Sequence, residues 1–528
     1  MKSHLLDTQW QRLPKDVILR LQGEALHRYL RDVVVPFSAH YSELFQKHGL
    51  RADSIRSVED LEQIPFTSKA DLVNTPDYPQ RSKDFLVIPD QQALSRRPST
   101  VLRALTRGRE RVKREFEIEY RPIFMTSTTG RSADPIPFLY TNHDIDRLAV
   151  AGKRVMEVCG AKRDFRLLNM FPFAPHLAFW LTHYASTEFG VFTLGTGGGK
   201  VMGTDGNLRL IQKIKPDVLI GMPTFLYHVM QHAVEEGLRC ESLKRLVLGG
   251  EKAAEGIRRK LRNLASKLGS PNVDVVATYG FTEAKMAWAE CPFAVDESPS
   301  GYHLYPDMGI VEVVDPKTGI AVPEGEPGEI VFTPLGARGT VVLRYRTGDV
   351  IEGGLVYQPC PHCGRTVPRL LGKISRNSEI KSMQIDKLKG TLVDFNQLEH
   401  VLDDTPSIDA WQLEIRKCND DPMELDELVL HVHKLNDAPD DKVTRELNNR
   451  FLERTEIRPN RVVFHDMEEM RQLLGVGVLL KEQKVIDHRP GKPVAATATT
   501  AAVSSLAPSE GERAGVRGPS VATNQTIA

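Results

Sequence analysis

Between residues 217 and 278, short apolar runs alternate with longer segments of helical character. The apolar runs are 217–221, 245–249 and 274–278, and the helical segments between them are 224–236 and 254–268. Such alternation is typical of parallel strands joined by covering helices, and it places ligand sites at the carboxyl ends of the strands. The pattern therefore predicts an α/β fold.

The chain is too long for one hydrophobic core. It has 528 residues, whereas a single core rarely serves more than about 250–300 residues. We expect a large N-terminal α/β domain of several subdomains and a small C-terminal α/β domain. The predicted regions are 1–122, mainly helical with a basic helical insertion; 123–376, an α/β core with a β-rich part; 377–490, the small domain; and 491–528, a disordered tail.

Charge excludes one class of partner. Lys plus Arg and Asp plus Glu number 69 each, which argues against a dedicated nucleic-acid binder. A basic run from Arg96 to Arg114 contains interleaved Leu, Val and Ala. We interpret it as a helix with a solvated basic face, and contact with an acidic partner is the alternative.

The N-terminal residues Met1 to Thr8 have no sustained apolar core, so no signal peptide is predicted. The most apolar stretch, 171–194, includes His176, His183 and Glu188, unlike a membrane span of about 20 apolar residues. Six scattered cysteines do not indicate a disulfide framework. These observations together predict a cytoplasmic protein.

Four short segments combine glycine with hydroxyl or acidic side chains after a β-like run. They are Thr126-Ser-Thr-Thr-Gly-Arg131, Leu246-Val-Leu-Gly-Gly-Glu251, Thr278-Tyr-Gly-Phe-Thr-Glu283 and Tyr345-Arg-Thr-Gly-Asp349. Each alone also fits an ordinary turn at the end of a strand. The four in this order form a signature.

That signature resembles the adenylate-forming superfamily, and within it the phenylacetate-CoA ligase-like branch, over about residues 40–490. The resemblance implies an AMP-forming acid–thiol ligase, which activates a carboxylic acid with ATP as an acyl-adenylate and then transfers the acyl group to coenzyme A. Such a site needs hydrogen-bond donors, Mg²⁺ and a positioned lysine to stabilise charge on the phosphoryl oxygens.

The resemblance assigns the nucleotide site residue by residue. The phosphate loop is Thr126, Ser127, Thr128, Thr129 and Gly130, with Arg131 near the departing phosphates; Thr282 faces the α-phosphate; Gly249, Gly250, Glu251, Tyr279 and Gly280 belong to the adenine side; and Asp349 accepts from the ribose. Glu283 is the implied magnesium ligand. Ser127 replaces the family's glycine and Arg131 its lysine, while Asp349 alone would also fit an Asx-turn.

The C-terminal assignments follow the same resemblance. Arg376 falls at the hinge arginine, and Ser378 and Glu379 replace two aspartates there. In this superfamily the small domain is mobile and rotates about that hinge between the two half-reactions. Lys481 is the expected adenylation lysine, with Lys484 as the alternative, although Leu480 stands where the family has glycine.

A Cys-x-x-Cys pair, Cys360 and Cys363, has the spacing of two thiolate ligands to zinc. The resemblance supplies Cys291 and His303 as the other two, with His362 able to replace His303, and implies a closed structural site. Two inert reduced cysteines or a redox pair are the alternatives.

The acyl pocket is the least specified part of the sequence. Its candidates are Phe173, His176, Met222 and Phe281, which fit core packing equally well. By analogy with the branch, an aryl or arylacetic acid is the expected substrate.

Three functions remain open from the sequence: an acyl-CoA ligase, an adenylating enzyme that passes its acyl group to a carrier protein or an amine, and a nucleotide-binding member without turnover. In the second, the basic segment at about 85–118 would dock an acidic carrier protein.

Overall fold

The computed structural model describes residues 9–75, 77–128, 135–376, 386–388, 391–393, 395–417, 426–435, 437–455, 458–476 and 482–488. Predictions for Thr129, Gly130, Arg131, Ser378, Glu379, Lys481 and the tail at 491–528 therefore lie outside the described residues. For Arg376 only the backbone is described.

A nine-stranded sheet forms the centre of the molecule, in the order β13-β14-β9-β8-β7-β6-β5-β3-β4. Its strands are β3 (Arg166–Pro172), β4 (Phe192–Gly197), β5 (Val218–Gly221), β6 (Arg245–Leu248), β7 (Asp274–Phe281), β8 (Met286–Ala289), β9 (Tyr302–His303), β13 (Leu355–Val356) and β14 (Arg369–Leu370). Strands β3 to β7 are parallel, and the remaining pairings are antiparallel.

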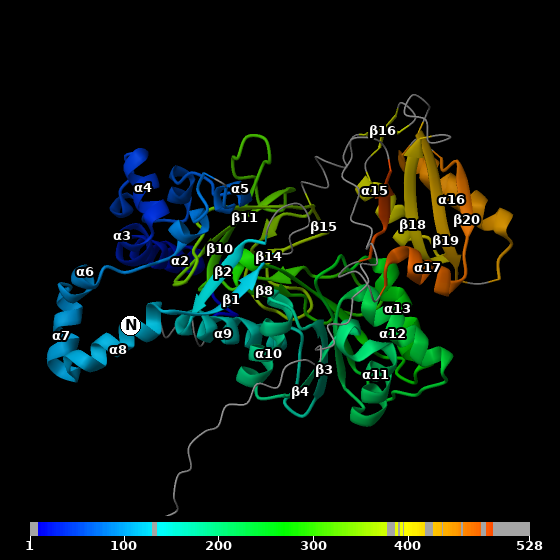
Figure 1. Cartoon of the computed structure of the whole chain (residues 1–528), viewed down its shortest axis with the longest axis horizontal. Coiled ribbons are helices and arrows are strands. Elements are labelled where there is room, and N and C mark those ends of the chain that lie inside the picture. Colours follow the sequence, from blue (N-terminus) through cyan, green and yellow to red (C-terminus); the bar gives the residue numbers. More distant parts are fainter. Residues whose placement is uncertain are drawn as a thin grey trace, which may run out of the picture.

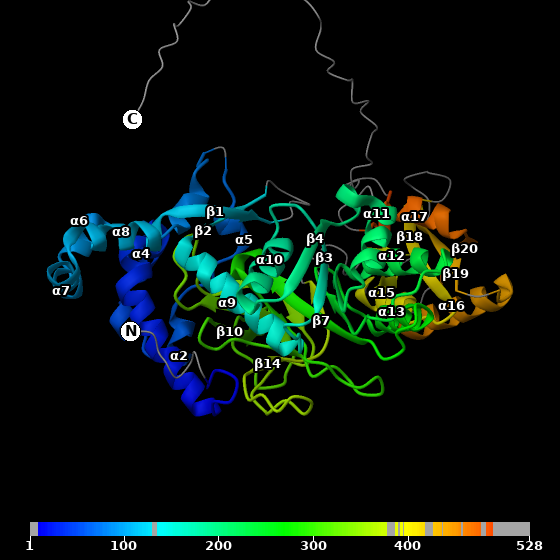
Figure 2. The same cartoon turned by 90° about the horizontal axis from the view of Figure 1, so that it is seen from below.

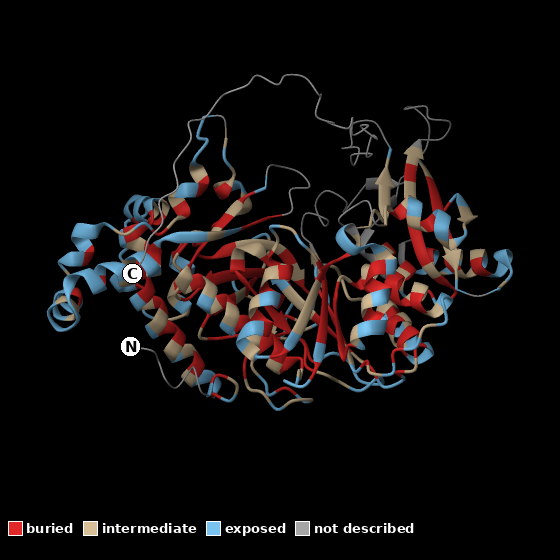
Figure 3. Ribbon diagram, turned by 60° about the horizontal axis from the view of Figure 1, so that its bottom comes forward, coloured by how far each residue is buried: buried red, intermediate tan, exposed pale blue. Residues whose placement is uncertain are grey.

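Helices cover both faces of this sheet (Figures 1 and 2). On one face lie α9 (Asn142–Val158) and α10 (Leu177–Phe189); on the other lie α11 (Gly199–Ile214), α12 (Pro223–Glu235) and α13 (Glu255–Lys267). Consecutive strand residues serve opposite faces, because Leu167 packs with the first helix layer and Leu168 with the second. Figure 3 shows the buried residues concentrated between these layers. The predicted α/β fold is confirmed.

Two smaller sheets adjoin this core. Strands β10 (Gly309–Val314), β11 (Gly328–Pro334), β12 (Tyr345–Ile351) and β15 (Ile374–Arg376) form an antiparallel sheet in that order. A separate antiparallel pair, β1 (Pro122–Ser127) and β2 (Pro137–Thr141), leads into and out of the predicted phosphate loop.

The N-terminal region is helical, as predicted. Its α-helices are α2 (Lys15–Tyr29), α3 (Val35–Phe37), α4 (Ala39–Lys47), α5 (Lys69–Leu72), α6 (Gln91–Ser95), α7 (Pro98–Arg107) and α8 (Arg109–Tyr120). The basic run differs from the prediction of one helix, because Gly108, at φ 88°, breaks it into α7 and α8.

Residues from Phe395 to His488, here called the C-terminal unit, have a hydrophobic cluster of their own. Their sheet has the order β20-β19-β18-β21. Its elements are α15 (Phe395–Asp403), β18 (Ile408–Lys417), β19 (Asp426–Lys434), α16 (Asp440–Thr455), β20 (Arg461–Phe464), α17 (Met467–Leu474) and β21 (Val485–Asp487). Among the described residues, no helix is long and apolar enough to cross a membrane.

Polar contacts join the C-terminal unit to α12. Tyr227 donates to Asp409 at 2.7 Å, and His228 Nε2 lies 2.8 Å from Glu482. The two units also approach closely at Gly256, where a Cβ would lie 1.9 Å from the carbonyl oxygen of Asp403. Only glycine therefore fits this point of contact.

Candidate active site

The adenine-side candidates meet at the carboxyl ends of β5, β6 and β7. The Gly249 amide donates to the Gly221 carbonyl at 3.1 Å. A Cβ on Gly249 would lie 2.5 Å from Thr278 Oγ1 and 3.2 Å from the Phe171 ring. The backbone here forms a flat surface that admits no side chain, at the edge where parallel sheets bind ligands.

Glu251 is held by hydrogen bonds from the first turn of α12. The hydroxyl of Thr224, in the first turn of that helix, donates to Glu251 Oε2 at 2.7 Å. Gly250 adopts a left-handed backbone at φ 81°, with the Met222 side chain beside it. Gly250, Glu251 and Met222 are thus held together at one end of the sheet.

Asp349 lies between the two sheets of the core. The Tyr279 hydroxyl donates to Asp349 Oδ2 at 2.8 Å, and Asp349 is only 5% exposed. In the pairing of β12 with β15, the Cα of Asp349 is opposite that of Arg376. Three predicted nucleotide residues from distant segments therefore meet at one point.

Glu283 lies on a single 3₁₀ turn, Thr282–Ala284, directly after β7. The Tyr345 hydroxyl donates to Glu283 Oε1 at 2.7 Å. Tyr345 begins β12, the strand that carries Asp349. The two predicted carboxylates are thereby linked through one strand.

Hydrogen bonds anchor the two phosphate-loop strands at their loop end. Thr128 exchanges two hydrogen bonds with Ile136, amide to carbonyl and amide to Oγ1, each 3.1 Å long. The Ser127 amide donates to the Pro175 carbonyl at 2.6 Å, and His176 Nδ1 donates to the Ser127 carbonyl at 3.1 Å. One ring nitrogen of His176 is therefore committed to the phosphate strand.

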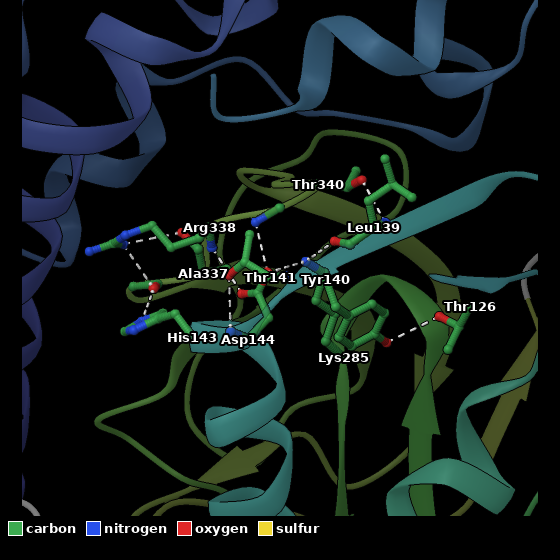
Figure 4. A network of polar contacts seen from close by, with 12 residues as sticks. Thr126, Leu139, Tyr140, Thr141, His143, Asp144, Lys285, Ala337, Arg338 and Thr340 are labelled. Carbon is green, nitrogen blue, oxygen red and sulfur yellow. Dashed lines mark hydrogen bonds and ion pairs between the residues drawn. The ribbon is translucent and has the colours of Figure 1, made fainter. Parts of the chain in front are cut away.

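Lys285 and Asp144, which the sequence analysis missed, connect this pair of strands to the turn that carries Glu283. Lys285, two residues beyond Glu283, points its Nζ to Asp144 Oδ2 at 3.1 Å and to the Leu139 carbonyl at 2.7 Å (Figure 4). Its Nζ also lies 4.7 Å from the centre of the Tyr140 ring. The Tyr140 hydroxyl is 3.1 Å from Thr126 Oγ1.

Burial governs the ionisation of this pair. Burial lowers the pKa of Lys285 despite the adjacent charge of Asp144. Burial alone would raise the pKa of Asp144, but the Lys285 charge and backbone amides of Arg338, Gly339 and Thr141 outweigh it, so that pKa falls. Lys285 also has a left-handed backbone at φ 56°, a conformation that non-glycine residues adopt at a cost.

The acyl-pocket candidates do not all gather in one place. Phe173 and His176 lie in the turn between β3 and α10, and Phe173 remains 51% exposed. Phe281 is instead 8% exposed and packs against Trp288 and Phe332, with ring centres 5.7 Å apart in each case. Phe281 is therefore part of an aromatic core beside the site.

The four predicted zinc ligands form one cluster. Ligand atoms of Cys291, His303, Cys360 and Cys363 all lie within 4.8 Å of one another. Cys291 and Cys360 sulfurs are 3.7 Å apart, close to the roughly 3.8 Å expected for two thiolates on tetrahedral zinc. His303 Nδ1 is 3.2 Å from the Ala289 carbonyl, which orients Nε2 towards the sulfurs.

His362, the alternative ligand, is engaged elsewhere: its Nε2 is 3.0 Å from the Ser298 carbonyl and its Nδ1 is 3.2 Å from Glu297. A hydrogen bond with Cys291 lowers the pKa of Cys363 to about 7. The donor set thus fits zinc, with His303 as its nitrogen ligand.

The two lysine candidates differ in what the structure describes. Lys484 Nζ lies 2.8 Å from Asp403 Oδ1 and 4.8 Å from the centre of the Trp411 ring. Lys484 therefore belongs to the packing of the C-terminal unit. Lys481 lies outside the described residues.

Comparison with known proteins extends this geometry. A family model described as AMP-binding enzyme matches residues 148–338. The chain is similar to phenylacetate-coenzyme A ligase from Thermus thermophilus, with 28% identity over 412 residues, covering 77% of this chain and 80% of the relative. A phenylacetate-coenzyme A ligase from Aromatoleum evansii is 25% identical, covering 70% and 73%.

Solved structures show the same fold. A 2-hydroxyisobutyryl-CoA ligase in the postadenylation state gives a TM-score of 0.68 at 19% identity, covering 91% of this chain and 92% of that one. The same ligase in its thioesterification state, with CoA, gives a TM-score of 0.56 at 19% identity and the same coverage.

Proposed function

We infer that the chain belongs to the adenylate-forming superfamily, in the phenylacetate-CoA ligase-like branch, as an AMP-forming acid–thiol ligase. On that premise we propose that it activates an aryl or arylacetic acid with ATP to an acyl-adenylate and transfers the acyl group to CoA. The observation that carries the proposal is the convergence of the glycine surface, Asp349 and Glu283 at the carboxyl end of the central sheet.

Each part has a physical role in the proposed reaction. The backbone at Gly249 and Gly250 lies along the adenine in this proposal, and close packing of Gly249 against Thr278 and Phe171 fixes its position. Asp349, oriented by Tyr279, accepts hydrogen bonds from the ribose hydroxyls. The phosphate loop begins where β1 ends at Ser127, and its role is to hold the polyphosphate; the amides of Ser127 and Thr128 anchor its first residues to Pro175 and Ile136.

A magnesium ion fits the same arrangement. Glu283 presents a carboxylate that Tyr345 fixes in place, and Mg²⁺ is commonly held by one or two carboxylates together with substrate phosphates. When bound, the ion would neutralise charge on the phosphates. Glu283 would hold it there, and Thr282 would face the α-phosphate.

Lys481 is the proposed lysine for adenylation. The contact of Lys484 with Asp403 favours this choice, because it gives Lys484 a structural role within the C-terminal unit.

A structural zinc ion is a second proposal, with Cys291, His303, Cys360 and Cys363 as ligands. Four protein ligands complete a tetrahedral shell and leave no position for substrate. The proposed role is to pin the β8–β9 segment to the Cys-x-x-Cys turn.

Carboxylate-dependent ATP–pyrophosphate exchange tests the reaction, with a panel of aryl, arylacetic and aliphatic acids. Exchange with aryl or arylacetic acids is expected, followed by thioester formation when CoA is added. Exchange without CoA thioester would favour a carrier protein or amine as acceptor. No exchange with any acid in folded protein would refute the proposal and favour the member without turnover.

A further inference from the structure

Helix α7 exposes apolar side chains to solvent and buries a polar one. Its neutral hydroxyl Thr100 is 7% exposed, whereas Val101, Leu102 and Leu105 are 46%, 63% and 80% exposed. Residues spaced i, i+1 and i+4 share one face of a helix. An apolar face thus points to solvent while polar residues face inward, the reverse of a surface helix in a monomeric protein.

The inward face of α7 is held by charge. Arg103 pairs with Glu115 of α8 and stacks over the Phe116 ring, with its guanidinium 5.3 Å from the ring centre. Arg107 and Arg111 approach the same carboxylate at 3.7 Å and 3.5 Å. These contacts fix the orientation of α7, so its apolar face is a defined surface of the fold.

The surroundings of that face are strongly basic. Residues 96–120, which include all of α7 and α8, contain seven arginines, one lysine and four glutamates, which gives a net charge of 8 − 4 = +4 in a chain whose total is +0. Three guanidiniums share the one Glu115 carboxylate, leaving donors able to bind further anions.

Shape and charge restrict what can cover this face. The α7–α8 pair projects from one end of the molecule, with α7 outermost (Figures 1 and 2), and it is mainly exposed (Figure 3). A second copy of the same projection would bring two net charges of +4 together, which is repulsive. The projecting α7–α8 pair could dock on a deformable surface, such as a lipid layer, without a concave binding site.

We propose that the α7–α8 projection docks on an anionic lipid surface. Val101, Leu102 and Leu105 enter the boundary between headgroups and acyl chains, and the surrounding arginines bind lipid phosphates. Apolar side chains ringed by basic residues on a short amphipathic helix have the chemistry of interfacial membrane binding, in which each Lys or Arg adds attraction to anionic lipid.

The test is flotation of the full-length protein with vesicles of phosphatidylcholine alone or mixed with phosphatidylglycerol, at low and high salt. The wild type is expected to float with the mixed vesicles at low salt only. The double variant Leu102→Ser/Leu105→Ser and the double variant Arg109→Glu/Arg114→Glu, at two exposed arginines of α8, should each lower vesicle partitioning by about tenfold or more. Ile320→Ser, at an apolar residue 69% exposed on a distant turn, is the matched control and should float like wild type.

Thermal unfolding followed by circular dichroism checks that the variants remain folded. Equal flotation of wild type and both double variants would overturn the proposal, as would absence of flotation with anionic vesicles. Binding of a purified acidic acyl carrier protein without vesicle binding, or a dimer in gel filtration that Leu102→Ser/Leu105→Ser dissociates, would assign the face to a protein partner instead.

Discussion

Lys285 and Asp144 form a buried ion pair across 141 residues of sequence, with 3.1 Å between Nζ and Oδ2. Their side chains are only 7% and 2% exposed. The pair attaches the turn after Glu283 to α9, while the Leu139 carbonyl attaches it to β2. Lys285 thus ties the turn that carries the predicted magnesium ligand to the phosphate strands.

Replacing that lysine should be costly. Lys285→Met leaves the Asp144 carboxylate buried without its cation, so the free energy of unfolding should fall by about 3–5 kcal/mol, and adenylate formation with it. Denaturant titration measures the loss. Lys244→Met is the matched control, because its lysine pairs with Asp217 at 2.7 Å but is 55% exposed; its cost should be below about 1 kcal/mol. Equal costs would contradict the structural role of Lys285.

The zinc proposal predicts a difference between two buried cysteines. Cys360→Ser should abolish bound zinc and lower the melting temperature, because it removes one of four ligands. Cys240→Ser changes a cysteine that is 4% exposed and outside the cluster, so zinc should remain at wild-type content. Elemental analysis of the purified proteins decides, and a wild type without zinc would refute the proposal.

The ribose role of Asp349 predicts an effect on nucleotide affinity. Asp349→Ala removes charge-assisted hydrogen bonds worth about 1.5–3 kcal/mol, so the KM for ATP should rise roughly tenfold or more. Tyr279→Phe removes only the hydroxyl that orients the carboxylate and should raise that KM less. Steady-state exchange kinetics measure both. An unchanged KM with a lower kcat would place Asp349 outside the ribose site.

Variants of Lys481 and Lys484 should differ in which property they lose, catalysis or stability. Lys481→Ala should abolish adenylate formation but leave thioester formation from preformed acyl-adenylate intact. Lys484→Ala removes the partner of Asp403 and should lower the melting temperature of the C-terminal unit. The two half-reactions, assayed separately, test the assignment. Equal loss of both half-reactions in Lys481→Ala would remove its catalytic role.

Lys260 lies on α13, near Asp403 and Asp409 of the C-terminal unit, and makes the free energy of unfolding depend on pH. Burial lowers its pKa to about 8 from an ordinary 10.5, despite the carboxylates of Asp409 and Asp403. Between these values the unfolded chain holds a proton that the folded chain has released, so this lysine makes the free energy of unfolding rise with pH. Lys260→Met should remove that contribution in denaturant titrations from pH 7 to 10. Exposed Lys267→Met, on the same helix, should follow the wild-type curve.

Sequence patterns predicted the fold well because the signals were local. The runs at 217–221 and 245–249 became β5 and β6, and the segments after them became α12 and α13. The Thr141–Asp144 capping box could also have been found, since a hydroxyl followed three residues later by an acid marks a helix start.

What the sequence did not reveal depends on tertiary packing. Nothing local distinguishes Lys285, which is buried, from an exposed lysine beside a turn. Likewise, the periodicity of residues 98–107 identifies an apolar face of α7 but not the side on which α8 packs. Phe281 is a similar case, because its place in the Tyr279–Glu283 motif did not reveal that its ring packs against Trp288 and Phe332.

The absent side chain at Gly256 has a mechanical consequence. A methyl group there would collide with the backbone of Asp403, which no rotamer change can relieve, yet Gly256 touches no group assigned to chemistry. Alanine at this position is therefore incompatible with the arrangement of the two units seen here. The absence of a side chain at Gly256 is thus required for α13 and the C-terminal unit to pack in the orientation seen here.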